Sequence, residues 1–397
     1  MYKRNRILTI YLFLTPWLAQ SSYANQDVLI NFHARIQLDA HDFTFPRLSD
    51  DFRSTSLSEL RQARLESVGV FYDTFKYKLS AEVSDEVEVK DAFIGIQGDA
   101  LRFEVGQFYY PFGNESQGES KYTEFMEKAS ITSLVSYGRD RGFSLQTFHS
   151  RYLFLQAGIV RGSGANTRDN DNGYDKVIRF GVDTNPRGKS DNRYLFGFSA
   201  AAGRQKSRQD DIIQIDSESH SGMVLFKAGL AENTQYLRSR FALESTILHG
   251  SFMLKPEFFY DHYGFDESVH ILGFYTAVSY FLTGEQRSLN NGLLTRQRVY
   301  HPISHGGWGA WEVALRYSSY TVNSAFYRDN TLYLGWKGLS KQDNPQKAHA
   351  LTFGLNWYPH GLIRLMANTI YTYTQHPQDN GYELREIAWM FRMQAEY

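Results

Sequence analysis

Hydrophobic and polar residues alternate along most of this chain with a period of two. Between Trp311 and Tyr317 the odd positions are all aromatic or aliphatic, whereas Glu312 and Arg316 occupy even positions. The same alternation recurs in residues 151–161, 351–357 and 363–368. Successive side chains of a strand point to opposite faces, so this period predicts β-strands with one apolar and one polar face.

Such segments can be marked from residue 28 to the last residue, and they predict an all-β fold of about 16 antiparallel strands. The predicted strands cover residues 28–39, 60–73, 75–84, 87–97, 101–109, 141–149, 151–161, 177–184, 193–203, 235–248, 250–261, 268–282, 307–320, 347–358, 362–376 and 384–397. Residues 211–230 and 329–339 could also form strands, so 18 strands remain possible.

The connections between these strands alternate in length. Short ones include residues 97–100, 149–150, 249–250 and 359–361, and long ones cover 40–59, 110–140, 162–176, 204–234 and 321–346. Bacterial membrane barrels have short turns at one end and long loops at the other. The connection at 283–306 breaks this rule, so either the strand count slips there or the segment folds at the end with the short turns.

Beyond residue 25 no apolar stretch approaches the length of a spanning helix, which excludes a helical membrane protein. Two further features favour a membrane barrel over a soluble sandwich. Aromatic residues crowd predicted strand ends, as at 108–110, 258–260 and 371–373, and the chain closes on an alternating strand that ends on Tyr397, which resembles the terminus of bacterial outer-membrane barrels. A closed transmembrane β-barrel with a polar lumen also explains why so aromatic a chain has a mean hydropathy of only −0.45.

The N-terminal residues predict a secretory signal peptide. Three basic residues precede an apolar stretch at 7–18, and Ser22 and Ala24 place small residues at a cleavage site. A membrane anchor is the alternative, but a spanning helix needs ~20 apolar residues. We therefore expect a signal peptide at residues 1–24 and a barrel at 25–397.

Composition excludes several classes of protein. The chain has no cysteine, so it has no disulfides and no cysteine-based metal site, and its formal charge of −1 argues against nucleic-acid binding. Removal of the signal's three basic residues leaves 39 basic against 43 acidic residues, a net charge of −4. No catalytic or metal-binding motif stands out, so we expect no cofactor.

The long connection at 110–140 is the predicted constriction loop. Tyr122, Phe125 and Met126 are spaced as on one face of a helix, and such an apolar stripe should pack against the barrel interior. An external loop across the rim is the alternative. The loop residues singled out as charged candidates are Lys121, Glu124, Glu127, Lys128 and Arg139.

Several short stretches resemble those of one family of channels. They are ELRQARL at 59–65, VKDAF at 89–93, GQFYYPFG at 106–113, FME at 125–127, GRDRG at 138–142, YFLTGE at 280–285, 311–317, GLNWYP at 354–359 and RLMAN at 364–368. With these the sequence resembles the phosphate-selective porin O and P family. The resemblance implies a homotrimeric, water-filled porin in the outer membrane of a Gram-negative bacterium that passes small anions, above all phosphate.

Arginines are the candidates for an anion path. By parity Arg64, Arg316 and Arg364 point into the lumen, and Arg141 opens the strand after the loop. Cations that line a low-dielectric constriction concentrate anions there, and the planar guanidinium matches phosphate oxygens. The alternative for each arginine is a structural pair with a neighbouring carboxylate. The loop 110–140 carries five acidic and three basic residues, which weighs against phosphate selectivity.

The leading hypothesis is thus a passive outer-membrane channel for small hydrophilic solutes, with a preference for anions, and not an enzyme. The alternatives are a barrel enzyme, such as a lipase or protease, and an adhesin that acts through its long loops. The twelve histidines permit an enzyme, but none lies in a recognisable catalytic pattern.

Overall fold

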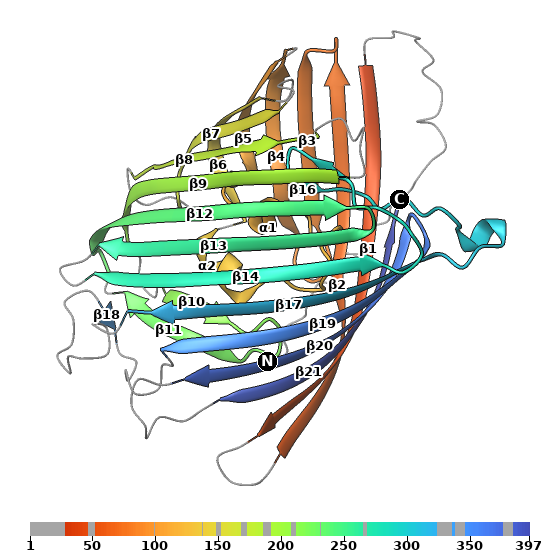
Figure 1. Cartoon of the computed structure of the whole chain (residues 1–397). Coiled ribbons are helices and arrows are strands. Elements are labelled where there is room, and N and C mark those ends of the chain that lie inside the picture. The colour runs from red at the N-terminus through yellow and green to blue at the C-terminus, as the bar shows by residue number, and fades with distance from the viewer. Residues whose placement is uncertain are drawn as a thin grey trace, which may run out of the picture.

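Sixteen antiparallel strands close into one barrel in the computed structural model (Figure 1). The structure describes residues 28–46, 52–98, 100–136, 138–147, 152–167, 173–185, 192–207, 212–230, 232–264, 268–323, 336–337, 346–375 and 384–397. The first strand pairs with the last, from Arg35 opposite Glu396 to Thr44 opposite Ile387, and this pairing removes any free sheet edge. The predicted signal peptide lies outside the described residues.

The barrel strands follow the chain in order, each paired with its sequence neighbour except at the seam. They are β1 (Val28–Pro46), β2 (Phe52–Phe71), β3 (Phe75–Glu82), β4 (Glu88–Gln97), β5 (Leu101–Tyr109), β6 (Arg139–Thr147), β7 (Leu153–Val160), β8 (Asp175–Asp183), β9 (Asn192–Lys206), β12 (Gln235–His249), β13 (Phe252–Gly264), β14 (Val269–Phe281), β17 (Ala310–Val322), β19 (Lys347–His360), β20 (Ile363–Gln375) and β21 (Arg385–Glu396).

The predicted strand count of 16 is confirmed, and the alternative of 18 is wrong. Residues 211–230 do contain β10 (Ile212–Asp216) and β11 (Val224–Leu230), but these pair with β18 (Trp336–Lys337) in a separate three-stranded sheet. The predicted loop at 40–59 is also mostly strand, because β1 and β2 stay paired as far as Pro46 opposite Phe52.

The predicted strand count is not off by one at the connection 283–306. This connection lies between β14 and β17, at the same end as the turns β12–β13 and β19–β20 and the C-terminus. It contains the short pair β15 (Leu289–Asn290) and β16 (Leu293–Leu294) and the turn of 3-10 helix η2 (Ile303–His305), which projects beyond the barrel in Figure 1.

Alternation along each strand separates a lipid-facing from a lumenal side. On β12, Leu237, Phe241 and Leu243 are exposed, whereas the neighbouring Arg240 and Glu244 are buried. Exposed aromatic and aliphatic residues of this kind surround the barrel, as they do in transmembrane barrels. Among the described residues, none of the helices has the length and hydropathy needed to cross a bilayer.

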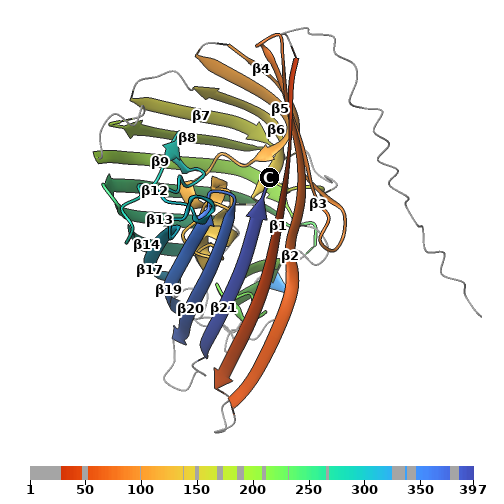
Figure 2. The ribbon, with the colours of Figure 1, turned by 90° about the vertical axis from the view of Figure 1, so that its right-hand side faces the viewer.

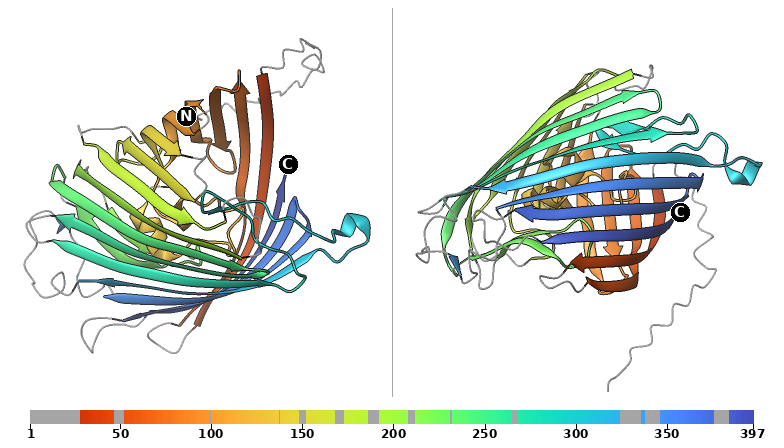
Figure 3. Two further views of the ribbon diagram at one scale, coloured as in Figure 1. Left: turned by 45° about the horizontal axis from the view of Figure 1, so that its top comes forward. Right: turned by 60° about the horizontal axis from the view of Figure 1, so that its bottom comes forward.

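The connection after β5 folds into the barrel, as predicted. Its helices α1 (Asn114–Gln117) and α2 (Ser130–Val135) lie within the ring of strands in Figures 2 and 3. Phe125 joins the main buried apolar cluster, Met126 packs with wall residues such as Met366, and Tyr122 packs against the 283–306 connection. The apolar stripe therefore faces the barrel interior, although residues 118–129 form turns and bends and not the expected helix.

The connection after β9 also enters the barrel, which the sequence pattern did not predict. Ile213, Ile215 and Phe226 of its strands join the same buried cluster as Leu134 of α2 and Tyr320 of the wall. In the described part of the chain, the lumen therefore holds two inserted segments from the long-loop end. They are here called the first insert (described residues of 110–138) and the second insert (described residues of 207–234).

Candidate functional site: the charged lumen

The first and second inserts are fastened to the wall by one buried arginine. Arg316 of β17 lies 3.3 Å from Glu115 of the first insert and 2.5 Å from Glu218 of the second. Ser318 and Thr352 donate further hydrogen bonds to Glu218. Arg316 points into the lumen as parity predicted, but only about 1% of its side chain is exposed. Its charge is used to hold the two inserts.

Arg364 of β20 also points inward and serves the first insert. Its Nη1 donates to the carbonyl of Thr123 at 2.6 Å, its Nη2 donates to that of Glu124 at 3.4 Å, and the guanidinium lies over the ring of Tyr358. Arg364 is 2% exposed. Arg364 therefore holds the first insert through backbone carbonyls, and no described carboxylate forms the ion pair that was the expected alternative.

Arg141 lies elsewhere. It shares its parity on β6 with Phe143 and Leu145, whose side chains are exposed on the lipid-facing side. Its guanidinium donates to the carbonyl of Thr167 in the β7–β8 connection. The structure thus does not bring Arg141 together with Arg64, Arg316 and Arg364.

The acidic loop candidates are ion-paired. Glu124 lies 2.9 Å from Lys255 of β13, and Glu127 contacts Arg61 of β2 at 3.3 Å and Arg392 of β21 at 2.9 Å. Burial acting alone would raise the pKa of Glu127, but Arg61 and Arg392 outweigh it and keep this pKa below its ordinary value. Both carboxylates therefore carry negative charge that the wall neutralises.

The basic loop candidates differ in their partners: Lys121 and Arg139 contact carboxylates, whereas Lys128 donates to a backbone carbonyl. Lys121 lies 3.3 Å from Glu119 and 3.4 Å from Glu396, and Arg139 makes two hydrogen bonds to Asp91. Lys128 donates to the carbonyl of Ser116, and burial lowers its pKa. Lys121 keeps 14% of its side chain exposed.

The wall from β8 to β17 is lined by further buried ion pairs. These pairs are Arg179–Glu244 at 2.6 Å, Arg193–Asp183, Arg238–Asp261 at 2.6 Å, Arg240–Asp175 and Arg287–Glu312 at 2.5 Å. Each arginine is neutralised by a carboxylate within hydrogen-bonding distance, so this side of the lumen offers little unpaired charge to a solute.

Charged side chains on the opposite wall, β1–β5, remain in contact with water. The exposed fraction is 24% for Arg61, 21% for Lys90, 22% for Arg102 and 15% for Lys78. Lys78 is shared between several carboxylates: its Nζ lies 2.9 Å from Glu66 and 3.5 Å from Asp91. These cations lie on strands that alternation predicted, but no motif in the sequence distinguished them from the more deeply buried arginines.

Arg35 of β1 stands directly opposite Arg64 of β2 on this wall. Arg64 is paired with Glu82 at 3.1 Å, yet its Nε is buried without a hydrogen-bond partner. Nε and Nη1 of Arg35 are likewise buried without one among the described residues. Like charges directly opposite each other destabilise a sheet, and unsatisfied buried donors are costly. Arg35 and Arg64 therefore leave buried donors that no described residue satisfies, at a place where two like charges face each other.

A closed barrel with an apolar outer band, an inserted loop and a charged, partly water-exposed wall defines an outer-membrane channel of a Gram-negative bacterium. The chain belongs to the phosphate-selective porin O and P family, whose family model matches residues 30–397. The resemblance drawn from its short motifs is thus confirmed.

Individual relatives are distant. An uncharacterized protein of Caulobacter vibrioides is 24% identical over 327 residues, which are 77% of this chain and 64% of that protein. This chain therefore spans slightly less than two thirds of the length of that relative.

Solved structures share the fold. The anion-selective porin of Comamonas acidovorans matches with a TM-score of 0.58 and 12% identity over 94% of this chain and 100% of that one. The outer-membrane channel DcaP of Acinetobacter baumannii matches with a TM-score of 0.58 and 8% identity over 94% and 99% of the two chains. OmpT, an outer membrane protein of Vibrio cholerae, matches with a TM-score of 0.55 and 11% identity over 93% of this chain and 98% of that one.

Proposed function

We propose that this channel is a passive, anion-preferring porin, that phosphate is among its solutes, and that it has no catalytic step. The main observation is the opposed pair Arg35 and Arg64, whose buried N–H donors include some that no described residue accepts from. Arg61 and Lys78 are exposed to water near them on the same wall. Cations in a narrow, low-dielectric lumen raise the local concentration of anions.

The arginines that we propose for the anion path differ from those that the sequence predicted. Arg64 stays in the proposed path, whereas Arg316 and Arg364 act as anchors of the inserts, and Arg141 is omitted because it shares the lipid-facing parity. A phosphate group offers several acceptor oxygens to the planar donor fork of arginine, which favours phosphate over chloride at Arg35 and Arg64.

We also propose a homotrimer. A trimer form of OmpT of Vibrio cholerae has been solved, and it shares this fold with a TM-score of 0.54 and 11% identity. Chemical cross-linking of the protein in mild detergent should give a ladder that ends at three chains, and a ladder that ends at one or two chains would contradict the trimer.

Planar-bilayer recording tests the proposed solute. In a potassium chloride gradient the reversal potential should lie on the anion side, and added phosphate should reduce the chloride current. Arg35→Gln should move the reversal potential toward cations and weaken the phosphate effect. Arg385→Gln is the matched control because Arg385 is exposed on the lipid-facing parity of β21. Cation preference of the unmodified channel, or equal effects of the two substitutions, would refute the proposal.

A further inference from the structure

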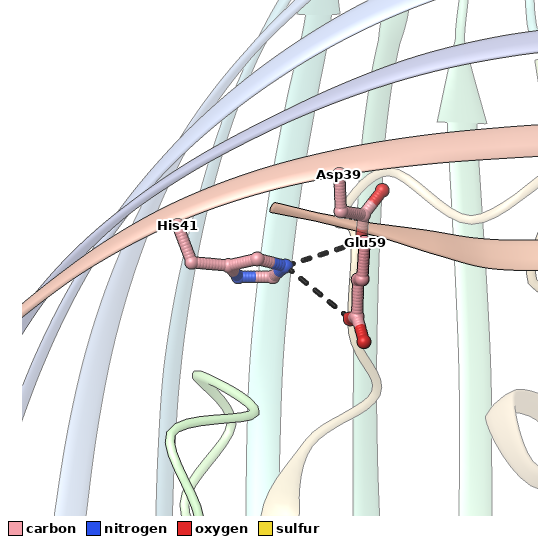
Figure 4. Close-up of side chains that lie close together, drawn as sticks. All are labelled: Asp39, His41 and Glu59. Atoms are coloured by element: carbon pink, nitrogen blue, oxygen red, sulfur yellow. Dashed lines mark ion pairs between the residues drawn. The ribbon is translucent and has the colours of Figure 1, made fainter. Parts of the chain in front are cut away.

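Three side chains converge on one point of the lumen wall close to the first insert. Asp39 and His41 follow each other on the inward parity of β1, and Glu59 stands directly opposite Asp39 on β2. Figure 4 shows the imidazole directed at both carboxylates. One ligand atom from each residue lies within 4.8 Å of the others.

His41 is buried but not satisfied. Its side chain has no exposed area, and neither ring nitrogen has a hydrogen-bond partner among the described residues. Oε1 of Glu59 is buried and lacks a hydrogen bond as well. A buried polar atom without a partner is rare in native proteins and points to a water or ion that completes the site.

The distances suit a metal ion better than a hydrogen bond. Nε2 of His41 lies 3.4 Å from Oδ2 of Asp39 and 3.6 Å from Oε1 of Glu59. Ligands ~2.0–2.2 Å from a tetrahedral zinc ion stand roughly 3.3–3.6 Å from one another. The two separations from the imidazole thus match those between ligands of one such ion, and all three atoms lie within 4.8 Å of one another.

Neighbouring groups support this arrangement. Arg392 donates to both oxygens of Asp39, at 2.7 and 2.6 Å, and orients the carboxylate in the way that outer hydrogen bonds orient metal ligands. The ring of His41 stacks on Phe43 with centroids 5.5 Å apart. The Glu59 side chain as a whole is 31% exposed although its Oε1 is buried, so an ion would reach the cluster from the side of Glu59.

The local charge also leaves room for a cation. Asp39, Glu59 and Glu127 face Arg61 and Arg392, so a neutral His41 leaves one net negative charge. One nitrogen and two carboxylate oxygens are typical ligands of zinc, whereas calcium takes six or more oxygens. We propose that Asp39, His41 and Glu59 form a binding site for a divalent transition metal ion, with Zn²⁺ as the best fit.

Titration of the full chain with zinc chloride tests this site. Metal-free protein in detergent should bind one zinc ion per chain by calorimetry, and binding should raise its thermal midpoint. His41→Gln and Glu59→Gln should each weaken binding roughly 10-fold or more, because each removes one ligand. An excess of calcium should not displace the zinc.

The chain offers two matched controls. His33 lies on the same face of β1 opposite Glu66 and so repeats the histidine–carboxylate pair without a third ligand. His270 stacks on His262 with ring centroids 4.6 Å apart, and these two imidazoles are a candidate pair of zinc ligands outside the cluster. His33→Gln and His270→Gln should leave the affinity unchanged. Absence of zinc binding, or equal affinity in all four variants, would overturn the proposal and leave an ordinary ion-paired histidine.

Discussion

Arg316 of β17 donates from Nη2 to Oε2 of Glu218 over 2.5 Å, although 98 positions separate the two residues in the chain. The same guanidinium reaches Glu115 and lies over the ring of Phe125, both in the first insert. One side chain therefore joins the wall to two inserted segments. A simultaneous exchange of Arg64, Arg316 and Arg364 would disturb these inserts as well as ion selectivity.

Arg316→Met should destabilise the barrel strongly. It leaves Glu115 and Glu218 buried without their cation, which typically costs about 3–5 kcal/mol. Urea unfolding of the protein refolded in detergent measures this loss. Arg296→Met is the control, because the Arg296 side chain is 44% exposed and a pair of this kind contributes about 0–1 kcal/mol. Similar losses for both variants would show that Arg316 does not anchor the inserts.

Glu257→Ala should release the start of the first insert. Its carboxylate accepts from the backbone N–H groups of Asn114 at 2.6 Å and Glu115 at 3.1 Å, and from Tyr275. Each buried donor left without an acceptor costs about 1–3 kcal/mol. Limited proteolysis should then cut within 110–138 in the variant and spare the unmodified protein. A first insert that stays protected from the protease in Glu257→Ala would contradict this role. Glu88→Ala is the control, because the Glu88 side chain is 46% exposed.

Glu119 should keep its charge far into the acid range. Burial acting alone would raise its pKa, but Lys78, Lys121 and Arg35 lower it to about 2. A pKa lowered by folding contributes stability that is present above the ordinary value of about 4.3 and is lost as the pH falls toward 2. The contact between insert and wall should therefore persist at ~pH 4 and loosen only below it.

Recording at several pH values checks this behaviour of Glu119. Glu119→Gln removes a negative charge beside the path and should increase anion preference at neutral pH. The difference in reversal potential between this variant and the unmodified channel should stay constant from ~pH 7 to ~pH 4. A difference that disappears near pH 4 would mean that Glu119 titrates as an ordinary glutamate.

Leu243→Arg should test the lipid-facing side. Leu243 is 62% exposed in the middle of β12, and an arginine at the bilayer midplane costs about 2–4 kcal/mol. Leu282 is 60% exposed but follows the end of β14, where the same change should cost only about 0–1 kcal/mol. Denaturant unfolding in lipid vesicles compares the two, and equal losses would argue against a bilayer midplane at the middle of β12 and an interface at the end of β14.

Much of the fold could be predicted because its signals are local. Alternation marks every barrel strand, and the contrast between short turns and long loops orders them. The stripe of Tyr122, Phe125 and Met126 predicted an insert because exposed apolar side chains need a surface to cover them. The end of β1 was missed because the polar residues Asp42 and Thr44 interrupt its apolar face, while backbone pairing continues to Pro46.

The roles of the charged residues could not be predicted in the same way. Parity predicted that Arg64 and Arg316 both face the lumen, but it does not predict which carboxylate pairs with each of them. Glu218 reaches Arg316 only because the second insert folds into the lumen. Glu82 accepts from Arg64, whereas Nε and Nη1 of Arg35 find no acceptor among the described residues. Alternation, a property of neighbouring residues, determines the barrel. Ion pairing joins residues far apart in sequence, so only the tertiary structure decides which cations remain for a solute.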